Sequence, residues 1–207
     1  MERKLMTHIG ESGFFVEAGA FDGYVQSNTY WLERFAGWHG LLIEPIPELY
    51  REAVRNRPAS RVVNCALVPP AASGEPVRMR FAGTMSIVAG ARGGEEGDEE
   101  YLRSAFAIPE EPYEVEVPGR TLSEVLDEAG APEIGLLSLD LEGYEAQALE
   151  GLDLERHAPR FIVVEVQDEA AERLVAGVLG DRYRVAERLS PMDVLFARQD
   201  TPGPLAR

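Results

Sequence analysis

The sequence predicts an α/β fold built on a mostly parallel, seven-stranded sheet, and three observations support this prediction. Apolar runs typical of buried strands alternate with segments of helical periodicity, a pattern that favours parallel strands joined by helices. The first run, at residues 13–18, leads through a glycine-containing turn into a helical segment, as in Rossmann-like domains. The last two runs, at residues 183–186 and 194–197, have no helix between them, so we expect an antiparallel hairpin at the C-terminal edge.

The first third of the chain contains three predicted strands and two helices, after a short polar arm at residues 1–12. Ser27 or Asn28 can act as the N-cap of the first helix, and Pro47 is well placed to begin the second. The run at residues 40–45 is continuously apolar up to a carboxylate, as expected for a parallel strand buried on both faces. The strands are predicted at residues 13–18, 40–45 and 61–68, and the helices at residues 28–35 and 47–57.

The middle of the chain is less regular. Residues 69–80 resemble a short hairpin, because Pro-Pro and Ser-Gly pairs mark turns beside an alternating segment. Residues 83–113 contain several glycines, a run of acidic residues and little periodicity. A connection of this length is seldom passive, so we expect either a mobile lid with one helical turn or an unstructured surface excursion.

Regular periodicity returns after residue 113. Thr121 and Glu124 have the spacing of a capping box, which predicts a helix beginning at this point. No internal repeat or second domain is visible, so residues 1–207 are predicted to form a single domain. The remaining strands are expected at residues 113–117, 134–140 and 161–166, and the remaining helices at residues 121–126, 145–149 and 170–179.

Composition and charge exclude several classes of partner. The net charge of −16 disfavours nucleic acid and anionic membrane surfaces, which attract basic proteins. Cys65 is the only cysteine, so no disulfide can form within the chain. No signal peptide or run long enough to span a membrane is visible. We therefore expect a cytoplasmic protein with a small-molecule partner.

Four predicted strands end on carboxylates. These are Glu17, with Asp22 in the turn that follows, then Glu44, then Asp140 with Glu142, and finally Glu165. In open sheets of parallel strands, the ligand lies beyond the carboxyl ends of the strands. Since the four strand ends share one edge, their acids are predicted to surround one binding site.

These acids bear on the choice of cofactor. The pyrophosphate of a dinucleotide would lie over the first glycine turn, where Glu17 and Asp22 would repel it. The third glycine of the G-x-G-x-x-G pattern is also missing. S-adenosylmethionine has no phosphate and carries an ammonium and a sulfonium, so it suits an acidic site. Glu44 could accept hydrogen bonds from both ribose hydroxyls, and Cys65 or Ala66 could line an adenine slot.

Several segments of the chain resemble the FkbM-type S-adenosylmethionine-dependent methyltransferases. The most specific segment is Asp140-Leu141-Glu142-Gly143-Tyr144-Glu145, and the similarity runs from about residue 13 to residue 167. The resemblance implies a Rossmann-like class I methyltransferase fold and transfer of methyl groups to hydroxyl oxygens of sugars or natural products. The other matching segments are residues 15–23, 27–29, 40–45, 64–67 and 120–122.

The acids near the fourth strand end are the predicted catalytic residues. A hydroxyl nucleophile has to lose a proton, and Asp140 is the first candidate for the general base, with Glu142 beside it. Asp140, Glu142 and Glu165 could also hold Mg²⁺, which would acidify a coordinated hydroxyl. Alternatively, Glu142 and Glu145 are structural, as helix caps or as partners of Arg120. The predicted substrate contacts are Ser86, Arg120 and Glu165.

The sequence leaves alternatives open. An NAD-dependent oxidoreductase or epimerase could use a similar fold, and a non-catalytic protein could bind the cofactor without transferring its methyl group. Many family members have a longer N-terminal region that helps to cover the substrate, and a homodimer could supply that cover here. The predicted cofactor-binding residues are Glu17, Gly19, Ala20, Asp22, Asn28, Glu44, Pro45, Cys65, Ala66 and Asp140.

Overall fold

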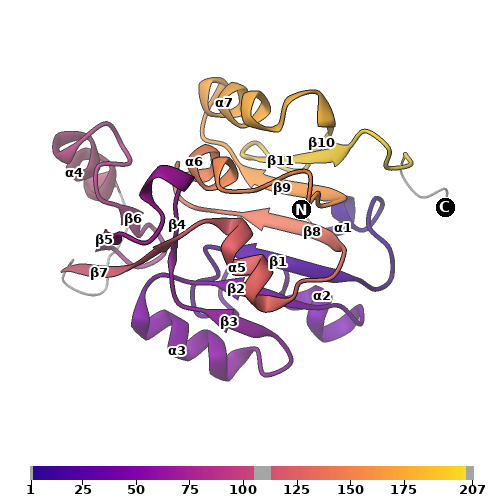
Figure 1. Ribbon diagram of the computed structural model, residues 1–207, viewed down its shortest axis with the longest axis horizontal. Coiled ribbons are helices and arrows are strands. Elements are labelled where there is room, and N and C mark those ends of the chain that lie inside the picture. Colours follow the sequence, from indigo (N-terminus) through magenta and orange to yellow (C-terminus); the bar gives the residue numbers. More distant parts are fainter. Residues whose placement is uncertain (1, 105–112, 204–207) are drawn as a thin grey trace.

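The computed structural model describes residues 2–104 and 113–203, and its main sheet has the predicted architecture (Figure 1). Seven strands lie in the order β10-β11-β9-β8-β1-β2-β3. Each neighbouring pair from β9 to β3 is parallel, whereas β11 runs antiparallel to both β9 and β10. The predicted Rossmann-like sheet with an antiparallel C-terminal hairpin is confirmed. The strands are β1 (Phe14–Ala18), β2 (His39–Ile43), β3 (Arg61–Val63), β8 (Ile134–Leu139), β9 (Phe161–Glu165), β10 (Tyr183–Arg188) and β11 (Asp193–Arg198).

Helices cover both faces of the main sheet. Successive strand residues point to opposite faces, so Val16 lies in a core cluster with residues of α5, α6 and α7, while Phe15 lies in the cluster that contains α1 and α2 residues. The predicted capping box is confirmed: Thr121 Oγ1 accepts a hydrogen bond from Glu124 N, and Thr121 N donates to Glu124 Oε2. These helices are α1 (Glu2–Leu5), α2 (Tyr30–Phe35), α3 (Pro47–Asn56), α5 (Leu122–Ala129), α6 (Glu145–Glu150) and α7 (Glu169–Leu179).

A second, four-stranded sheet lies beyond the carboxyl ends of the parallel strands (Figure 1). Its strands have the order β4-β7-β5-β6, and its side chains Met79, Phe81 and Val117 pack on Ile46 and Leu49 near the start of α3. The second sheet therefore forms a wall over the edge of the main sheet where the acids were predicted. The strands are β4 (Ala66–Leu67), β5 (Pro76–Phe81), β6 (Ile87–Val88) and β7 (Tyr113–Arg120).

This sheet corrects two predictions. The predicted strand at residues 61–68 is two strands, β3 in the main sheet and β4 in the second. The predicted hairpin at residues 69–80 is wrong, because β5 pairs with the distant β7 over six residues and with the short β6. A short 3₁₀ helix, Pro70–Ala72, occupies the start of that segment.

The predicted lid contains more regular structure than expected. The helix α4 (Glu95–Ser104) follows β6, and Figure 1 shows it at the far end of the second sheet. Asp98 is buried in this acidic helix and accepts hydrogen bonds from Gly90 N (2.6 Å) and Arg92 N (3.1 Å). Acidic residues in the first turn of a helix interact favourably with its dipole, which explains how the run supports a helix. Residues 105–112 of the predicted lid lie outside the described residues.

The N-terminal segment is packed against the main sheet, unlike the predicted polar arm. Leu5 and Ile9 are buried in the cluster that also contains Phe15, Trp38 and Phe161. Within the described ranges, no helix combines the length and the apolar composition that crossing a membrane requires.

Candidate functional site

A cavity lies at the carboxyl edge of the main sheet. Gly19, Glu44 and Asp140 line it from the ends of β1, β2 and β8, and Met79 and Val88 line it from the second sheet. Concave sites at this edge of an open parallel sheet are where ligands bind. We refer to this cavity as the first cavity.

Gly19 brings the first turn into direct contact with the backbone at Asp140. Its φ is +79°, and a Cβ atom at this position would lie 1.8 Å from the carbonyl oxygen of Asp140. No side chain fits that gap. The glycine therefore sets the distance between the two strand ends on which the first cavity is built.

The turn after β1 is held by a buried ion pair between Glu17 and Arg57. The Glu17 carboxylate accepts hydrogen bonds from Ser27 Oγ, Asn28 N (2.6 Å) and Thr29 Oγ1 (2.6 Å), and Arg57 Nη1 lies 3.4 Å from it. The fully buried Arg57 also donates to Glu33, to Thr29 Oγ1 and to the carbonyl oxygen of Gly23. This network joins the end of β1 to the start of α2 and the end of α3.

Four predicted cofactor-binding residues do not line the first cavity: Asn28, which is described below, and Glu17, Asp22 and Ala20. Glu17 is directed into the network just described, because its oxygens are needed there to satisfy buried donors. Asp22 folds back on its own turn and accepts hydrogen bonds from Tyr24 N (2.8 Å) and Val25 N (2.7 Å). Ala20 is buried in the hydrophobic cluster with Phe15.

Glu44 remains at the first cavity, as predicted. It is buried, with 3% of its surface exposed, and it accepts hydrogen bonds from Phe21 N (2.9 Å) and Ile46 N (2.8 Å). Burial raises the pKa of Glu44 to about 8, although these two hydrogen bonds oppose the shift. Asn64 fixes the backbone here, since its Nδ2 donates to the carbonyl oxygens of Glu44 and Pro45.

Pro45, Cys65 and Ala66 also line the first cavity, next to Glu44. Burial raises the pKa of the Cys65 thiol to about 12, so the thiol stays protonated at neutral pH. A protonated, buried thiol is a poor nucleophile and a good packing group. Cys65 can therefore line an adenine slot but offers no reactive thiolate.

A second, more open cavity adjoins the first. Asp140, Glu142, Glu165 and Asp193 line it, and so does Asn28, which was predicted to contact the cofactor. Asn28 Nδ2 donates to Ser138 Oγ (3.0 Å). The residues that line both cavities mark the junction between them: Gln26, Thr84, Asp140 and Glu142.

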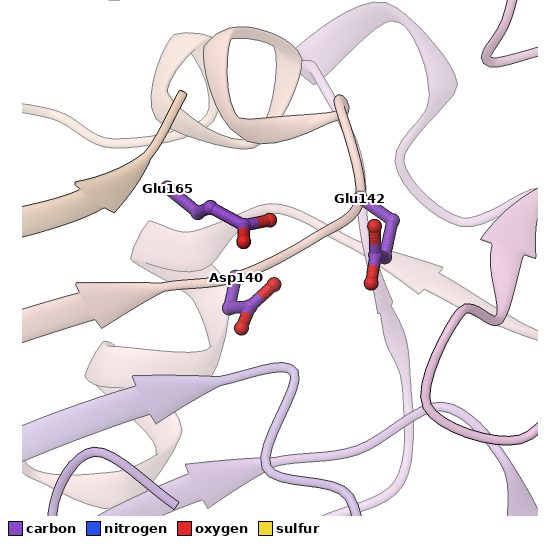
Figure 2. A group of neighbouring side chains, drawn as sticks. All are labelled: Asp140, Glu142 and Glu165. Atoms are coloured by element: carbon purple, nitrogen blue, oxygen red, sulfur yellow. The ribbon is translucent and has the colours of Figure 1, made fainter. Parts of the chain in front are cut away.

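The three acids predicted as possible metal ligands, two of which (Asp140 and Glu142) were also predicted to be catalytic, come together at this junction. Figure 2 shows Asp140, Glu142 and Glu165 directed toward the same space, and one oxygen of each lies within 4.8 Å of the others. Burial, and then the charges of Glu165 and Glu142, raise the pKa of Asp140 well above its usual value. Burial and the charge of Glu142 raise the pKa of Glu165 to about 7, and the two side chains share a hydrogen bond. Asp140 and Glu165 thus form a pair able to hold one proton near neutral pH.

Glu142 has partners that the other two acids lack in the described part of the chain. Tyr101 Oη donates to Glu142 Oε2, and Arg92 Nη2 lies 3.6 Å from the same oxygen. The Arg92 guanidinium lies 3.8 Å from the centroid of the Tyr101 ring and donates to Gln167. Burial raises the pKa of Glu142, and both Tyr101 and Arg92 oppose that shift.

The predicted substrate contacts are divided between three places. Glu165 lines the second cavity, and Ser86 lines the first, where its hydroxyl donates to the carbonyl oxygen of Gly83. Arg120 was predicted to reach substrate or an acid of the site, but it lines neither cavity. Its Nη1 pairs with Glu128 of α5 at 2.8 Å, and its Nη2 donates to the carbonyl oxygen of Glu124.

Glu145 has a structural role, which was one of the two alternatives that the sequence left open for this acid. Its Oε1 accepts hydrogen bonds from Leu141 N (2.9 Å) and Gly143 N (3.0 Å), so it closes the turn after β8. Arg120 pairs with neither Glu142 nor Glu145.

Sequence reasoning missed Gln26 and Tyr101. Gln26 precedes the Ser27-Asn28 pair that was noticed, but a glutamine in a turn carries no signal of its own. Tyr101 follows an acidic run that predicted mobility, and only the helix α4 directs it toward Glu142.

The acid triad has a donor set suited to a hard divalent cation. Opposite ligands of Mg²⁺ are about 4.2 Å apart, so the oxygens of Asp140, Glu142 and Glu165 would need only small movements to hold it. Tyr101 and Arg92 would compete with the ion for Glu142. The residues fit such an ion, and magnesium binding stays a prediction.

Sequence comparisons identify relatives of this chain. A model of the methyltransferase FkbM domain matches residues 17–187. The 31-O-demethyl-FK506 methyltransferase FkbM of Streptomyces tacrolimicus is 29% identical over 166 residues, which are 72% of this chain and 63% of that protein. This chain thus spans less than two thirds of the length of that curated relative.

Two solved structures are more distant. A TehB-like SAM-dependent methyltransferase from Corynebacterium glutamicum is 12% identical, with a TM-score of 0.48 and coverage of 95% of this chain and 85% of that chain. A mutant of MtNAS in complex with S-adenosylmethionine is 13% identical, with a TM-score of 0.43 and coverage of 95% of this chain and 58% of that chain.

The buried ion pair predicts a large effect of Arg57→Met on stability. Removing one partner of a buried pair leaves the other charge uncompensated, which costs about 3–5 kcal/mol of unfolding free energy. Urea unfolding followed by circular dichroism would measure this loss. Arg61→Met, which removes a solvent-exposed ion pair with Glu128, is the control and should leave the midpoint almost unchanged. Equal effects of the two substitutions would contradict the role given to Arg57.

Gly19→Ala should damage both folding and the first cavity. The added methyl group overlaps the carbonyl oxygen of Asp140, so the two strand ends must separate. Gly130→Ala is the matched control, because Gly130 also has a positive φ (+60°) but no atom within 4 Å of its missing Cβ. In thermal and urea unfolding, Gly19→Ala should cost at least about 2 kcal/mol more than the control. A similar cost for both variants would mean that the close approach is unimportant.

Proposed function

The chain belongs to the FkbM family of methyltransferases, and we propose that it transfers a methyl group from S-adenosylmethionine to a hydroxyl oxygen of a small molecule, such as a sugar or a natural-product scaffold. The observation that carries this proposal is the pair of adjoining cavities, with Glu44 in the first and the acids Asp140 and Glu165 in the second. Such an arrangement provides separate places for a methyl donor and an acceptor that meet at one junction.

The first cavity suits the donor. Ionised Glu44, held by two backbone N–H groups, can accept hydrogen bonds from the two ribose hydroxyls. Pro45, Cys65 and Ala66 line the same cavity beside it and offer an apolar slot for the adenine. When bound, S-adenosylmethionine supplies a methyl group on a sulfonium, which is a good leaving group. Gly19 and Asp140 line the same cavity and would face the methionine end of a donor whose nucleoside is held at Glu44.

The second cavity suits the acceptor. Asp140 lines both cavities, so an acceptor hydroxyl beside it lies next to the donor end of the first cavity. The Asp140–Glu165 pair would accept the proton that this hydroxyl has to lose when it is methylated. Correct placement of the two molecules supplies much of the remaining rate enhancement, since it replaces a collision with an oriented encounter.

The choice of oxygen as the accepting atom has separate support. The name of the relative from Streptomyces tacrolimicus describes methylation of an oxygen of 31-O-demethyl-FK506. The acids at the junction are the groups that a neutral hydroxyl needs as proton acceptors. Family membership favours a methyltransferase over an NAD-dependent oxidoreductase. A protein that binds the donor without transferring its methyl group is the remaining alternative, and the proton-accepting pair counts against it.

S-adenosylhomocysteine should bind the wild-type protein, and Glu44→Ala should weaken this binding at least tenfold. Two hydrogen bonds to a charged acceptor, each contributing about 1.5–3 kcal/mol, account for a loss of this size. Isothermal titration calorimetry would measure both constants. Glu52→Ala, a solvent-exposed change on α3, is the control and should leave the affinity unchanged. Absence of wild-type binding at millimolar ligand would contradict the proposed function, whereas an unchanged affinity of a folded Glu44→Ala protein would contradict only the ribose contact.

The affinity for S-adenosylhomocysteine should rise with pH through the pKa of Glu44. This group has a pKa of about 8 in the ligand-free protein, so it is mostly protonated at pH 6.5 and mostly ionised at pH 8.5. The ionised form accepts hydrogen bonds from both ribose hydroxyls, so affinity should increase roughly tenfold between these values. The variant Glu44→Gln has no ionisable group at this position, so its affinity should change little with pH. This comparison distinguishes ionisation of Glu44 from ionisation of the ligand as the cause of the pH dependence. A pH profile shared by both proteins would exclude Glu44 as its source.

A further inference from the structure

Gln26 occupies the junction between the two cavities without a role in the mechanism described above. It lies in the loop between Asp22 and α2 and is one of the four residues that line both cavities. Two of the others, Asp140 and Glu142, are acids of the triad, and the fourth is Thr84 on the wall side. A side chain at this point is close to where a methyl group would pass from donor to acceptor.

The backbone at Gln26 is strained. Its φ is +56°, in the left-handed region that residues with side chains other than Asn and Asp rarely adopt. In the described residues, the non-glycine positions with positive φ are Phe21, Gln26 and Glu142, and all three line the first cavity. Strained backbone persists where the surroundings impose it, and it concentrates at functional sites.

The neighbours of Gln26 impose this conformation. Just before it, Tyr24 N and Val25 N are held by the Asp22 carboxylate. Directly after it, Ser27 Oγ and Asn28 N are held by Glu17. Gln26 is thus the residue at which the loop has to turn between two fixed ends. The turn leaves its side chain exposed to the cavities, and no hydrogen bond joins its carboxamide to another described residue.

We propose that Gln26 contacts the methyl donor at its sulfonium end and so fixes the position of the transferred methyl group. This inference rests on the proposed function. The carboxamide oxygen carries a partial negative charge, and the C–H bonds of a methyl group on a positively charged sulfur are polarised donors for such an oxygen. A neutral amide supplies this contact without adding another titrating carboxylate beside Asp140 and Glu142. The amide also cannot remove a proton, so it positions the donor without replacing the base.

The two forms of the ligand provide the test. S-adenosylmethionine has the sulfonium and its methyl group, whereas S-adenosylhomocysteine has a neutral thioether and is otherwise the same molecule. Calorimetry on the wild-type protein, Gln26→Ala and the remote control Gln199→Ala would give the ratio of the two affinities. Gln26→Ala should reduce the preference for S-adenosylmethionine by about two- to fivefold, as expected for the loss of weak C–H···O contacts. Gln199→Ala should leave the ratio unchanged.

The variant Gln26→Gly tests whether a changed affinity ratio results from misfolding of the loop and not from loss of the side chain. Glycine adopts positive φ without strain, so this variant should fold with a melting temperature about 1–2 °C above that of the wild type. It should show the same loss of preference as Gln26→Ala. An unchanged ratio, or an equal loss of affinity for both ligands, in these two folded variants would overturn the role of Gln26 and leave the proposed function standing. Failure of the wild-type protein to bind either ligand would overturn both.

Discussion

The donor side of the site depends on the buried ion pair of Glu17 and Arg57. Two charges removed from water are tolerated only when hydrogen bonds satisfy them, and here hydroxyl, amide and carbonyl groups of residues 23–29 do so. The consequence is that a loop without regular structure becomes fixed at one end by the end of β1 and at the other by α3. That fixed loop carries Gln26 and adjoins Gly19, so the shape of the first cavity follows from an interaction outside it.

The acids at the strand ends differ in what surrounds them. Glu17 and Glu145 have donors from their own turns and serve the fold. Among the described residues, Asp140 and Glu165 share a hydrogen bond and have no cationic partner. Burial raises the pKa of both; the charges of Glu165 and Glu142 add to the shift of Asp140, and the charge of Glu142 adds to that of Glu165, so the pair is left to interact with ligands. Glu44 lies between these cases, because two backbone N–H groups hold it but no cation neutralises it within the described chain. The number and kind of donors around each carboxylate therefore separates structural acids from those available for binding and proton transfer.

These surroundings explain what could be predicted from the sequence. The central strands of the main sheet were found because their residues are mostly apolar, and the convergence of Glu44, Asp140 and Glu165 followed from parallel strands sharing one edge. The second sheet was missed because β5 finds its partner β7 more than thirty residues later, and no local pattern encodes that pairing. The placement of Glu17 was missed for a related reason, since Arg57, just after α3, comes close enough to pair with its carboxylate only in the folded chain. Periodicity predicts which residues lie at the carboxyl edge of the sheet, but it does not predict the hydrogen-bond or ion-pair partner of each side chain there.

The segment Asp140-Leu141-Glu142-Gly143-Tyr144-Glu145 combines several of these physical requirements in six residues. Asp140 faces both cavities, while Glu145 closes the turn behind it by accepting two backbone N–H groups. Glu142 adopts a left-handed φ of +54°, which directs its carboxylate to Tyr101 and Arg92 of the α4 region. A Cβ atom at Gly143 would lie 2.9 Å from Arg92 Nη1, so glycine is required for the guanidinium to reach this position. The segment that supplies the proton acceptor is therefore also the place where the α4 region is attached, and a movement of α4 would act directly on the acids at the junction.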